Sequence, residues 1–550
     1  MAFQLSPGVL VTERDDTLSV PSVSTTAGAF VGHFQWGPVE EVVLIDSEKD
    51  LVTTFGKPNN SNYNSFFTAA NFLSYGNNLQ VVRVAPTSAR NASAGSVSIL
   101  VKNDASYETA NLVSVGEWIA RFPGPLGNSI SVSMADANTF STWGYANQFP
   151  SSAPNTSSYA LSLGGKLDEM HVIVLDADGT WTGAAGTVLE KFPYVSKASD
   201  AKALDGSSSY YKEVINRTSA YIRWGNHTAQ GTNWGNVATG LTFANLSANV
   251  TKTLALATPA IESGNTLTGW SIFANDELYD ISLIPLSDSN TTVATWVINN
   301  VAEVRKDCMV FVSPAYVDVV NNTAAVSSVV TFRNSLPSSS YAVMDSGWKY
   351  QYDRYNDVYR WVPLNGDTAG LTARTDFVAD PWFSPAGFNR GGVKNVVKLA
   401  YSPSKTDRDT LYKAGVNPVV TFPGQGTVLF GDKTLLTRPS AFDRINVRRL
   451  FIVLEKAIAT AAKFQLFEFN DAFTRAQFKN LVEPFLRDVQ GRRGITDFRV
   501  ICDETNNTAQ IIDTNQFVAD IYIKPARSIN FIQLNFIATR SGVAFEEVGA

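Results

Sequence analysis

Two aspartates, Asp176 and Asp178, come closer to a catalytic pattern than other residues of this chain. They follow an apolar run at 172–175 and are followed by Gly179 and Thr180. The pattern predicts a buried strand that ends at the first aspartate, with a turn after it. A carboxylate held in that position can act as a nucleophile and form a covalent intermediate. The reaction that it would support is phosphoryl transfer.

These aspartates also have a purely structural explanation. The motif resembles the phosphatase loop of haloacid-dehalogenase-type enzymes, in which the first aspartate attacks phosphorus. Such an enzyme needs a helix and further strand–helix–strand units after the loop, whereas the surrounding sequence is rich in Ser and Gly. Asp-Gly between two apolar runs is a strong hairpin signal. We therefore predict a turn between two β-strands, and a phosphatase acting through Asp176 is the enzyme alternative.

Residues 426–434 come close to a phosphate-binding loop. Asp432 stands between Gly431 and Lys433, which breaks the spacing and puts a negative charge where phosphates would bind. Residues 427–430 are apolar or β-branched and favour a strand. We therefore expect a strand here and no nucleotide site.

The histidines and cysteines do not form a reactive constellation. His33, His171 and His227 are scattered, without carboxylate or cysteine at the spacing of a metal site. No Gly-x-Ser-x-Gly motif offers a serine nucleophile. Cys308 and Cys502 each lie in an apolar run and are predicted to be buried thiols in a reducing compartment. We expect no enzyme activity, no cofactor and no metal.

The composition excludes several classes of protein. A net charge of -6 argues against a dedicated nucleic-acid binder, whose surface would be basic. There is no leader peptide and no apolar run of about 18 residues, so we predict neither secretion nor a membrane span. Charged residues make up only 17% of the chain, which suits a subunit packed against copies of itself. An ordinary Asn/Ser/Thr-rich β protein is the alternative.

Two amphipathic helices are the clearest elements that the C-terminal sequence predicts. Apolar residues recur at helical spacing over 445–458, after Asp443, whose side chain suits a helix start. A second helix is predicted to begin at Asn470 or Asp471. Pro484 lies within it and should kink or divide it.

Strands are predicted after these helices and at both ends of the chain. Alternating apolar residues favour strands at 498–502, 518–523 and 532–538, and a short last one at 543–546. Residues 1–20 are predicted to form an extended arm. Exposed apolar strands are aggregation templates unless they are paired, and the edge of a neighbour's sheet can pair with them. The alternative is that both arms fold back on their own chain.

The remaining sequence predicts an α/β body interrupted by β-rich insertions. The fold class is therefore α/β plus β, multidomain, with an α+β C-terminal domain. The predicted divisions are 1–20, the N-terminal arm; 21–87 with 331–438, a discontinuous α/β middle domain; 88–200, an inserted β-barrel or sandwich; 201–330, a second inserted mixed α/β domain; 439–539, the α+β C-terminal domain; and 540–550, a C-terminal arm strand.

Residues 442–451, Phe-Asp-Arg-Ile-Asn-Val-Arg-Arg-Leu-Phe, resemble a signature of contractile phage tail sheath proteins. The same resemblance extends to 502–503 with 506–508, to 512–513 and to 525–532. It is closest to sheaths of the T-even type. It covers roughly 440–550, with weaker support at the N-terminus and at 340–440.

The resemblance implies a subunit that polymerises as hexameric rings around a tail tube and contracts to drive the tube through the host cell envelope. It also implies outward-facing protrusion domains and exchange of terminal strands between subunits. The residues expected in strand exchange are Val9, Leu10, Val11, Ile532, Leu534, Phe536, Val543 and Phe545. Expected partners are other copies of the chain, the tail tube protein, and baseplate and tail terminator proteins. The protein is expected in the virion tail, after assembly in the host bacterial cytoplasm.

Basic residues of the two C-terminal helices are the expected contact with the tube, because sheaths hold the tube through a helix of this domain, often by charge complementarity. They are Arg475, Lys479, Arg487, Arg492 and Arg493, with Arg448 and Arg449 on the first helix. A solvated helix face or contacts between subunits are the alternatives. At the level of function, a phage-derived tailocin-like particle and a receptor-binding tail protein remain alternatives.

Overall fold

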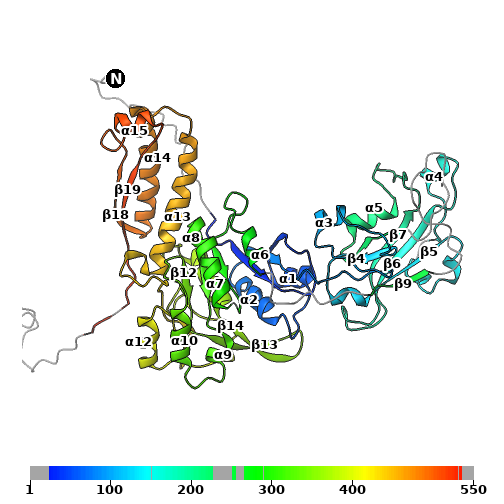
Figure 1. The fold of residues 1–550 in the computed structure, drawn as a ribbon, viewed down its shortest axis with the longest axis horizontal. Helices are drawn as coiled ribbons and strands as arrows, with labels where there is room; N and C mark the ends of the chain where they lie inside the picture. Colours follow the sequence, from blue (N-terminus) through cyan, green and yellow to red (C-terminus); the bar gives the residue numbers. More distant parts are fainter. Residues whose placement is uncertain are drawn as a thin grey trace, which may run out of the picture. The chain divides into compact units, whose positions relative to one another are not determined.

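The computed structural model describes residues 24–149, 152–226, 250–255, 266–288, 290–530 and 532–534 (Figure 1). They belong to two compact units. The larger unit contains Ser24–Val378 and Pro385–Asp443, and the smaller one contains Ala379–Ser384 and the chain from Arg444 onward. Helices and several separate sheets occur together in the chain, as the predicted mixed α/β, multidomain class requires.

A six-stranded sheet forms the centre of the larger unit, in the order β12–β11–β10–β1–β3–β2. Neighbouring strands are parallel, except that β2 is antiparallel to β3. Strands β1, β10 and β11 are buried along their whole length, which explains why they are continuous apolar runs rather than alternating ones. The strands are β1 (Gly28–Gly32), β2 (Val42–Ile45), β3 (Leu79–Arg83), β10 (Leu283–Pro285), β11 (Met309–Val312) and β12 (Ala342–Met344).

This sheet joins regions that the sequence analysis separated. We assigned 201–330 to a second inserted domain, but β10 and β11 pair with β1 and β12 in the central sheet. The assignment is therefore wrong for the part that contains these strands. Strands of three or four residues carry no periodicity that identifies the sheet they join, because pairing is decided by distant parts of the chain.

Helices pack on both faces of the central sheet. Helices α2 and α11 pack on each other and against its strands, while α6 packs against β1 at Val31 on the other face. At Gly366 the two helix backbones approach so closely that a Cβ atom would lie 2.4 Å from the carbonyl oxygen of Thr68. The helices of this part of the larger unit are α1 (Glu48–Phe55), α2 (Tyr63–Leu73), α6 (Thr266–Ile272), α7 (Thr291–Val297), η4 (Ile298–Ala302), α8 (Glu303–Arg305), α9 (Tyr316–Val319), α10 (Ala325–Asn334) and α11 (Asn365–Val378).

Two smaller sheets complete this part of the larger unit. Strand β13 pairs on both sides, with β14 and β15, and β16 and β17 form a hairpin. The elements are β13 (Trp348–Asp353), β14 (Val358–Pro363), β15 (Lys398–Leu399), α12 (Lys405–Lys413), β16 (Val419–Phe422), β17 (Gly426–Leu429) and η5 (Ala441–Asp443).

An inserted β-rich region follows β3 and has its own core. Its main sheet is antiparallel, in the order β7–β6–β5–β9. Strands β4 and β8 form a second, two-stranded antiparallel sheet. Trp118, Tyr211 and Trp224 pack edge-to-face within this core. The elements are α3 (Asp104–Glu108), β4 (Trp118–Ala120), η1 (Pro125–Ser129), β5 (Ile130–Asp136), η2 (Phe140–Thr142), η3 (Ala146–Gln148), α4 (Ser158–Ser162), β6 (Glu169–Asp176), β7 (Thr187–Ser196), α5 (Tyr211–Thr218), β8 (Ile222–Trp224) and β9 (Val250–Thr253).

The insertion extends past the boundary at 200 that the sequence predicted. Strands β8 and β9 lie beyond residue 200 and pair with β4 and β5, which lie before it. Arg83, at the end of β3, links the insertion to the central sheet. Its buried guanidinium donates to the carbonyl oxygens of Phe34, Gly37 and Pro123 at 2.9, 2.6 and 2.6 Å.

The smaller unit is built from a helical hairpin and a two-stranded antiparallel sheet (Figure 1). Apolar side chains of both helices pack with the inward-facing residues of the sheet in one core that includes Leu450, Val482 and Val500. The elements are α13 (Ile445–Ala462), η6 (Lys463–Gln465), α14 (Ala472–Gly491), β18 (Ile495–Ile501), α15 (Ala509–Asp513) and β19 (Asp520–Pro525).

The helix starts differ in how well the sequence predicted them. Asp471 caps α14, since its carboxylate accepts the backbone N–H of Thr474 at 2.8 Å, as expected. Asp443 does not cap α13: it ends a 3₁₀ turn, and Arg444 occupies the cap position without a side-chain hydrogen bond. Pro484 lies inside α14, which is one continuous helix rather than two pieces.

The described residues contain no helix whose length and apolarity would suffice to cross a lipid bilayer.

Candidate functional site

Asp176 organises a loop between two antiparallel strands. The chain passes from β6 through residues 177–186 into β7, so no helix follows the motif and the predicted hairpin is confirmed. The carboxylate accepts the backbone N–H groups of Gly179, Trp181 and Thr182 at 3.1, 3.1 and 2.8 Å. Burial acts to raise the pKa of Asp176, but these bonds and one from Ser129 outweigh it and hold the pKa below its usual value. All of this geometry stabilises the loop.

The stretch that resembles a phosphate-binding loop is also structural. Residues 426–429 form β17, as predicted, and the described chain continues beyond Lys433 without a helix until residue 441. The buried carboxylate of Asp432 accepts the Tyr412 hydroxyl at 3.1 Å. Lys433 donates to the Tyr412 carbonyl oxygen at 2.7 Å, so its ammonium group serves the local fold.

Two of the three histidines lie in the described part of the chain, while His227 lies outside it. His171 is buried and stacks on Phe149, with ring centroids 4.5 Å apart. Its Nδ1 accepts the backbone N–H of Tyr194 at 3.0 Å, and burial lowers the pKa of the ring. Within the described ranges, no three His, Cys, Asp or Glu side chains are grouped closely enough to hold a metal ion.

The carboxyl ends of the parallel strands, where α/β proteins commonly bind ligands, are filled by the chain itself. Ser287, Ser313 and Asp345 follow β10, β11 and β12, and all three are buried. The amide side chain of Asn365, at the start of α11, donates to the Ser287 carbonyl oxygen at 2.7 Å and accepts its N–H at 3.0 Å. Ser313 donates to Asp345 at 2.7 Å.

Next to these residues lies a buried ion pair. The Lys349 ammonium group contacts the Asp367 carboxylate at 2.9 Å, and the Tyr75 hydroxyl donates to the same oxygen at 2.9 Å. The edge of the sheet is therefore closed by a polar network in place of a ligand.

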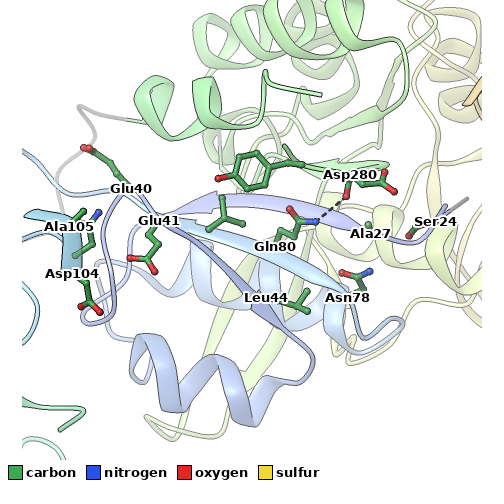
Figure 2. Close-up of a pocket in the computed structure, with 13 residues that line it drawn as sticks. Ser24, Ala27, Glu40, Glu41, Leu44, Asn78, Gln80, Asp104, Ala105 and Asp280 are labelled. Carbon is green, nitrogen blue, oxygen red and sulfur yellow. Dashed lines mark hydrogen bonds between the residues drawn. The ribbon is translucent and has the colours of Figure 1, made fainter. Parts of the chain in front are cut away.

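A shallow acidic hollow of about 790 Å³ opens beside the edge strand β2 (Figure 2). Gln80 lies in it and donates to the Asp280 carbonyl oxygen at 3.0 Å. Two of its carboxylates already have cationic partners: Glu40 pairs with Lys102 at 2.6 Å, and Asp104 pairs with Arg121 and Arg223. The Glu40–Lys102 pair ties the inserted region to the chain beside β2, whereas the Asp104 pairs lie within the insertion.

The predicted basic residues of α13 and α14 fall into two groups. Arg448, Arg449 and Arg475 are buried in the folded chain, so their side chains are not exposed to a partner. Arg475 donates to the carbonyl oxygen and side-chain oxygen of Asn470 at 3.2 and 2.9 Å. Their burial therefore does not support the prediction that these three residues contact the tail tube.

Of the other four basic residues, Arg487, Arg492 and Arg493 are exposed and Lys479 is half-exposed, and the four lie along α14 and just beyond its end. Lys479 and Arg487 flank Glu483 one turn away on each side, at 3.6 and 3.5 Å. Arg492 pairs with Asp380 and with Asp488, and Arg493 is exposed. Exposed pairs of this kind contribute only ~0–1 kcal/mol each, so a partner can replace them at little cost.

The sheet of the smaller unit has open edges. Among the described residues neither β18 nor β19 has a third strand beside it. Of the residues predicted for strand exchange, only Ile532 and Leu534 lie in the described part, and Val9, Leu10, Val11, Phe536, Val543 and Phe545 lie outside it. Ile532 and Leu534 are 78% and 71% exposed and are not in a strand of their own chain.

A further feature escaped the sequence analysis. The connection between α13 and α14, together with the first turn of α14, exposes several large apolar side chains, those of Phe464, Leu466, Phe467, Phe469 and Phe473. The signal was present in the sequence, because a connection between two amphipathic helices is normally polar.

The fold is similar to that of one class of solved structures, the sheaths of contractile systems. The sheath tail protein of Listeria innocua has a similar fold, with a TM-score of 0.56, 12% identity, and coverage of 92% of this chain and 93% of that one. The sheath of an extracellular contractile injection system in its contracted state gives a TM-score of 0.53 at 13% identity, covering 98% and 99%.

The sequence comparison narrows this class. Family profiles match at 25–84 (tail sheath protein Gp18 domain III N-terminal region), 276–435 (phage tail sheath protein central domain) and 437–539 (phage tail sheath C-terminal domain). The tail sheath protein of Salmonella phage ViI is 35% identical, covering 100% of this chain and 98% of its own. That of Enterobacteria phage T4 is 32% identical, covering 99% of each. The chain belongs to the phage tail sheath protein family.

Proposed function

We propose that this chain polymerises as stacked hexameric rings around a tail tube and contracts to drive the tube through the host cell envelope. The observation that carries the proposal is the similarity to tail sheath proteins of phages ViI and T4 over the whole length of the chain. The energy for contraction is stored in subunit packing, with no nucleotide. Contacts that repeat without closing generate helical polymers of this kind.

Exchange of terminal strands holds the polymer together during contraction. Two observations support this part: the open edges of the β18–β19 sheet, and the exposure of Ile532 and Leu534 in a segment with the alternation of a strand. Burying each such side chain against a neighbour would stabilise the contact by ~1.5–3 kcal/mol. The arms can therefore act as tethers while weaker contacts change.

The inner contact is made by the basic residues that remain exposed on and after α14. Lys479, Arg487, Arg492 and Arg493 would face an acidic tube through many weak ion pairs. Baseplate and tail terminator proteins would bind the ends of the polymer. The subunits would assemble in the host bacterial cytoplasm and remain in the virion tail.

Removal of the chain ends tests the proposal. We expect variants lacking residues 1–20 or 540–550 to remain folded monomers that do not form striated hollow cylinders in negative-stain electron micrographs. A matched control replaces Leu161 and Leu204, exposed apolar side chains of the inserted region, with Ser and should assemble as the full chain does. Truncated chains that still build contractile cylinders would contradict strand exchange.

A further inference from the structure

The connection between α13 and α14 and the first turn of α14 form an apolar tip on the smaller unit. We define this apolar tip by its five side chains: Phe464, Leu466, Phe467, Phe469 and Phe473, which are 63–105% exposed. Isolated exposed apolar residues are normal on protein surfaces, but five of them within residues 464–473 are not isolated and point to an interaction site. The segment contains only Lys463, Glu468 and Asp471 as charged neighbours.

The loop is held in place by hydrogen bonds to the residues on either side of α15. The Asn470 amide donates to the side-chain oxygen of Asn507 at 3.2 Å and to the carbonyl oxygen of Gln516 at 2.8 Å. The Asp471 cap fixes the start of α14. Phe467 adopts the left-handed region, with a φ of 71°, which bulky residues rarely do. The apolar tip is therefore a fixed surface next to α15.

We propose that the apolar tip docks on a second copy of this chain in the assembled sheath. The inference rests on the proposed function, because it requires a homopolymer. A phenylalanine buries roughly 150–250 Å² in a contact, so the four phenylalanines of the tip would supply roughly 600–1,000 Å². One side of a stable protein–protein interface buries about 800 Å². The tip alone is thus large enough to form most of one such side.

The position of the tip favours another copy of the chain over the tail tube. Three of the four basic residues that suit an acidic tube, Arg487, Arg492 and Arg493, lie in the C-terminal half of α14 and just beyond it, whereas the tip lies at its N-terminal end. A helix of 20 residues is about 30 Å long at 1.5 Å per residue. The two surfaces therefore address different partners.

The larger unit offers an apolar surface of the kind that the tip needs. Phe388, Phe422 and Phe430 form an aromatic cluster with ring centroids 5.2–6.0 Å apart. Phe388 and Phe430 are both exposed. A heterologous contact in a helical polymer requires two different patches on every copy, and the tip and this cluster provide two apolar patches.

Labelling at the tip tests the proposal directly. Cys308 and Cys502 are buried, so a Phe467→Cys variant of the full chain can be labelled selectively with an environment-sensitive fluorophore. We expect the label to be open to iodide quenching in the monomer, and to become protected, with a blue-shifted emission, when the chain polymerises. The control is the same label at Leu204→Cys, an exposed site of the inserted region, which should stay quenchable in both states.

Three results of this experiment would overturn the proposal. Protection in the monomer would mean that the chain covers its own tip. Protection that appears only when tube protein is added would identify the tube as the occupant. A label that stays quenchable in polymers of the labelled chain would show that nothing docks there.

A second variant tests the consequence for assembly. We expect Phe464, Phe467, Phe469 and Phe473 replaced together with Ser to keep the melting temperature of the monomer and to raise the critical concentration for polymerisation at least tenfold. Equal assembly of this variant and the full chain would overturn the proposal. If the unsubstituted chain never polymerises, the proposed function fails first, and light scattering reveals that before any variant is compared.

Discussion

Asp345 is a buried acid whose protonation couples to the stability of the larger unit. Its carboxylate accepts hydrogen bonds from the Ser313 hydroxyl at 2.7 Å and the Gly347 backbone N–H at 2.9 Å. Burial is the main cause that raises its pKa to about 8, and the neighbouring Asp367 acts in the same direction. The folded chain therefore holds a proton that the unfolded chain releases at neutral pH.

The sign of the pH dependence follows from this raised pKa. The contribution of neutral Asp345 is complete below the ordinary carboxyl pKa near 4 and is lost as the pH rises through about 8. The free energy of unfolding should fall across this window with a slope of up to ~1.4 kcal/mol per pH unit. Asp345→Asn, which can still accept the Gly347 N–H, should remove that slope in urea titrations at pH 5 and pH 8.

The matched control for this measurement is Asp409→Asn, an exposed carboxylate on α12. It should leave the difference between the two pH values as it is in the unsubstituted chain. An unchanged slope in Asp345→Asn would show that the buried carboxyl is ionised throughout.

At the scale of elements, the close approach of α2 and α11 fixes the packing of the central layer. Gly366→Ala would place its Cβ atom 2.4 Å from the Thr68 carbonyl oxygen, which is backbone and cannot rotate away. We expect a loss of ~1–3 kcal/mol in the free energy of unfolding, as for other overpacked sites, measured by chemical denaturation.

Gly491→Ala is the control for this substitution, because nothing lies within 4 Å of the position that its Cβ atom would take, and α14 ends there. It should be neutral or slightly stabilising, since Ala is favoured over Gly in a helix. Equal effects at the two positions would mean that backbone entropy, and not the helix contact, decides the cost.

Helix α11 also shows where sequence patterns stop being informative. Its residues 365–375 are nearly all buried yet largely polar, so no apolar stripe marks it and we did not predict it. The hydroxyl groups of Thr368, Thr372 and Thr375 bond to carbonyl oxygens one turn back, at 3.3, 2.8 and 2.8 Å. Such internally satisfied polar groups can be buried, but the satisfaction is visible only in three dimensions.

The elements that were predicted well have local signals. Asp471 marks the start of α14, and the alternation at 498–502 and 518–523 marks β18 and β19, because capping and pleating depend on nearby residues. The failures at Asp443 and at β10 are not local, since a neighbouring turn and distant strands decide them. In the candidate site, sequence identified basic residues but could not tell buried Arg475 from exposed Arg487.

At the scale of the whole molecule, charge on α14 should govern binding to the tube. We expect Lys479→Glu with Arg487→Glu to weaken the binding of subunits to isolated tubes at least tenfold, because two attractions become repulsions while the exposed positions leave the fold intact. Binding by the unsubstituted chain should fall as salt rises. Co-sedimentation with tubes over a range of salt concentrations measures both effects.

Arg217→Glu, an exposed residue of the inserted region, is the control for this charge change and should bind tubes as the unsubstituted chain does. If the α14 variant also retained full binding, the basic residues would be a solvated face and another surface would hold the tube.

The burial of both thiols, at Cys308 and Cys502, has a consequence for the virion tail. A free virion is exposed to dissolved oxygen, and exposed thiols on adjacent subunits would oxidise to disulfides that join the subunits covalently. Subunits that are joined in this way could not slide past each other. Because both thiols are buried, no copy offers a cysteine that slow oxidation could link to a neighbouring subunit. The tail can therefore be stored without losing its ability to contract.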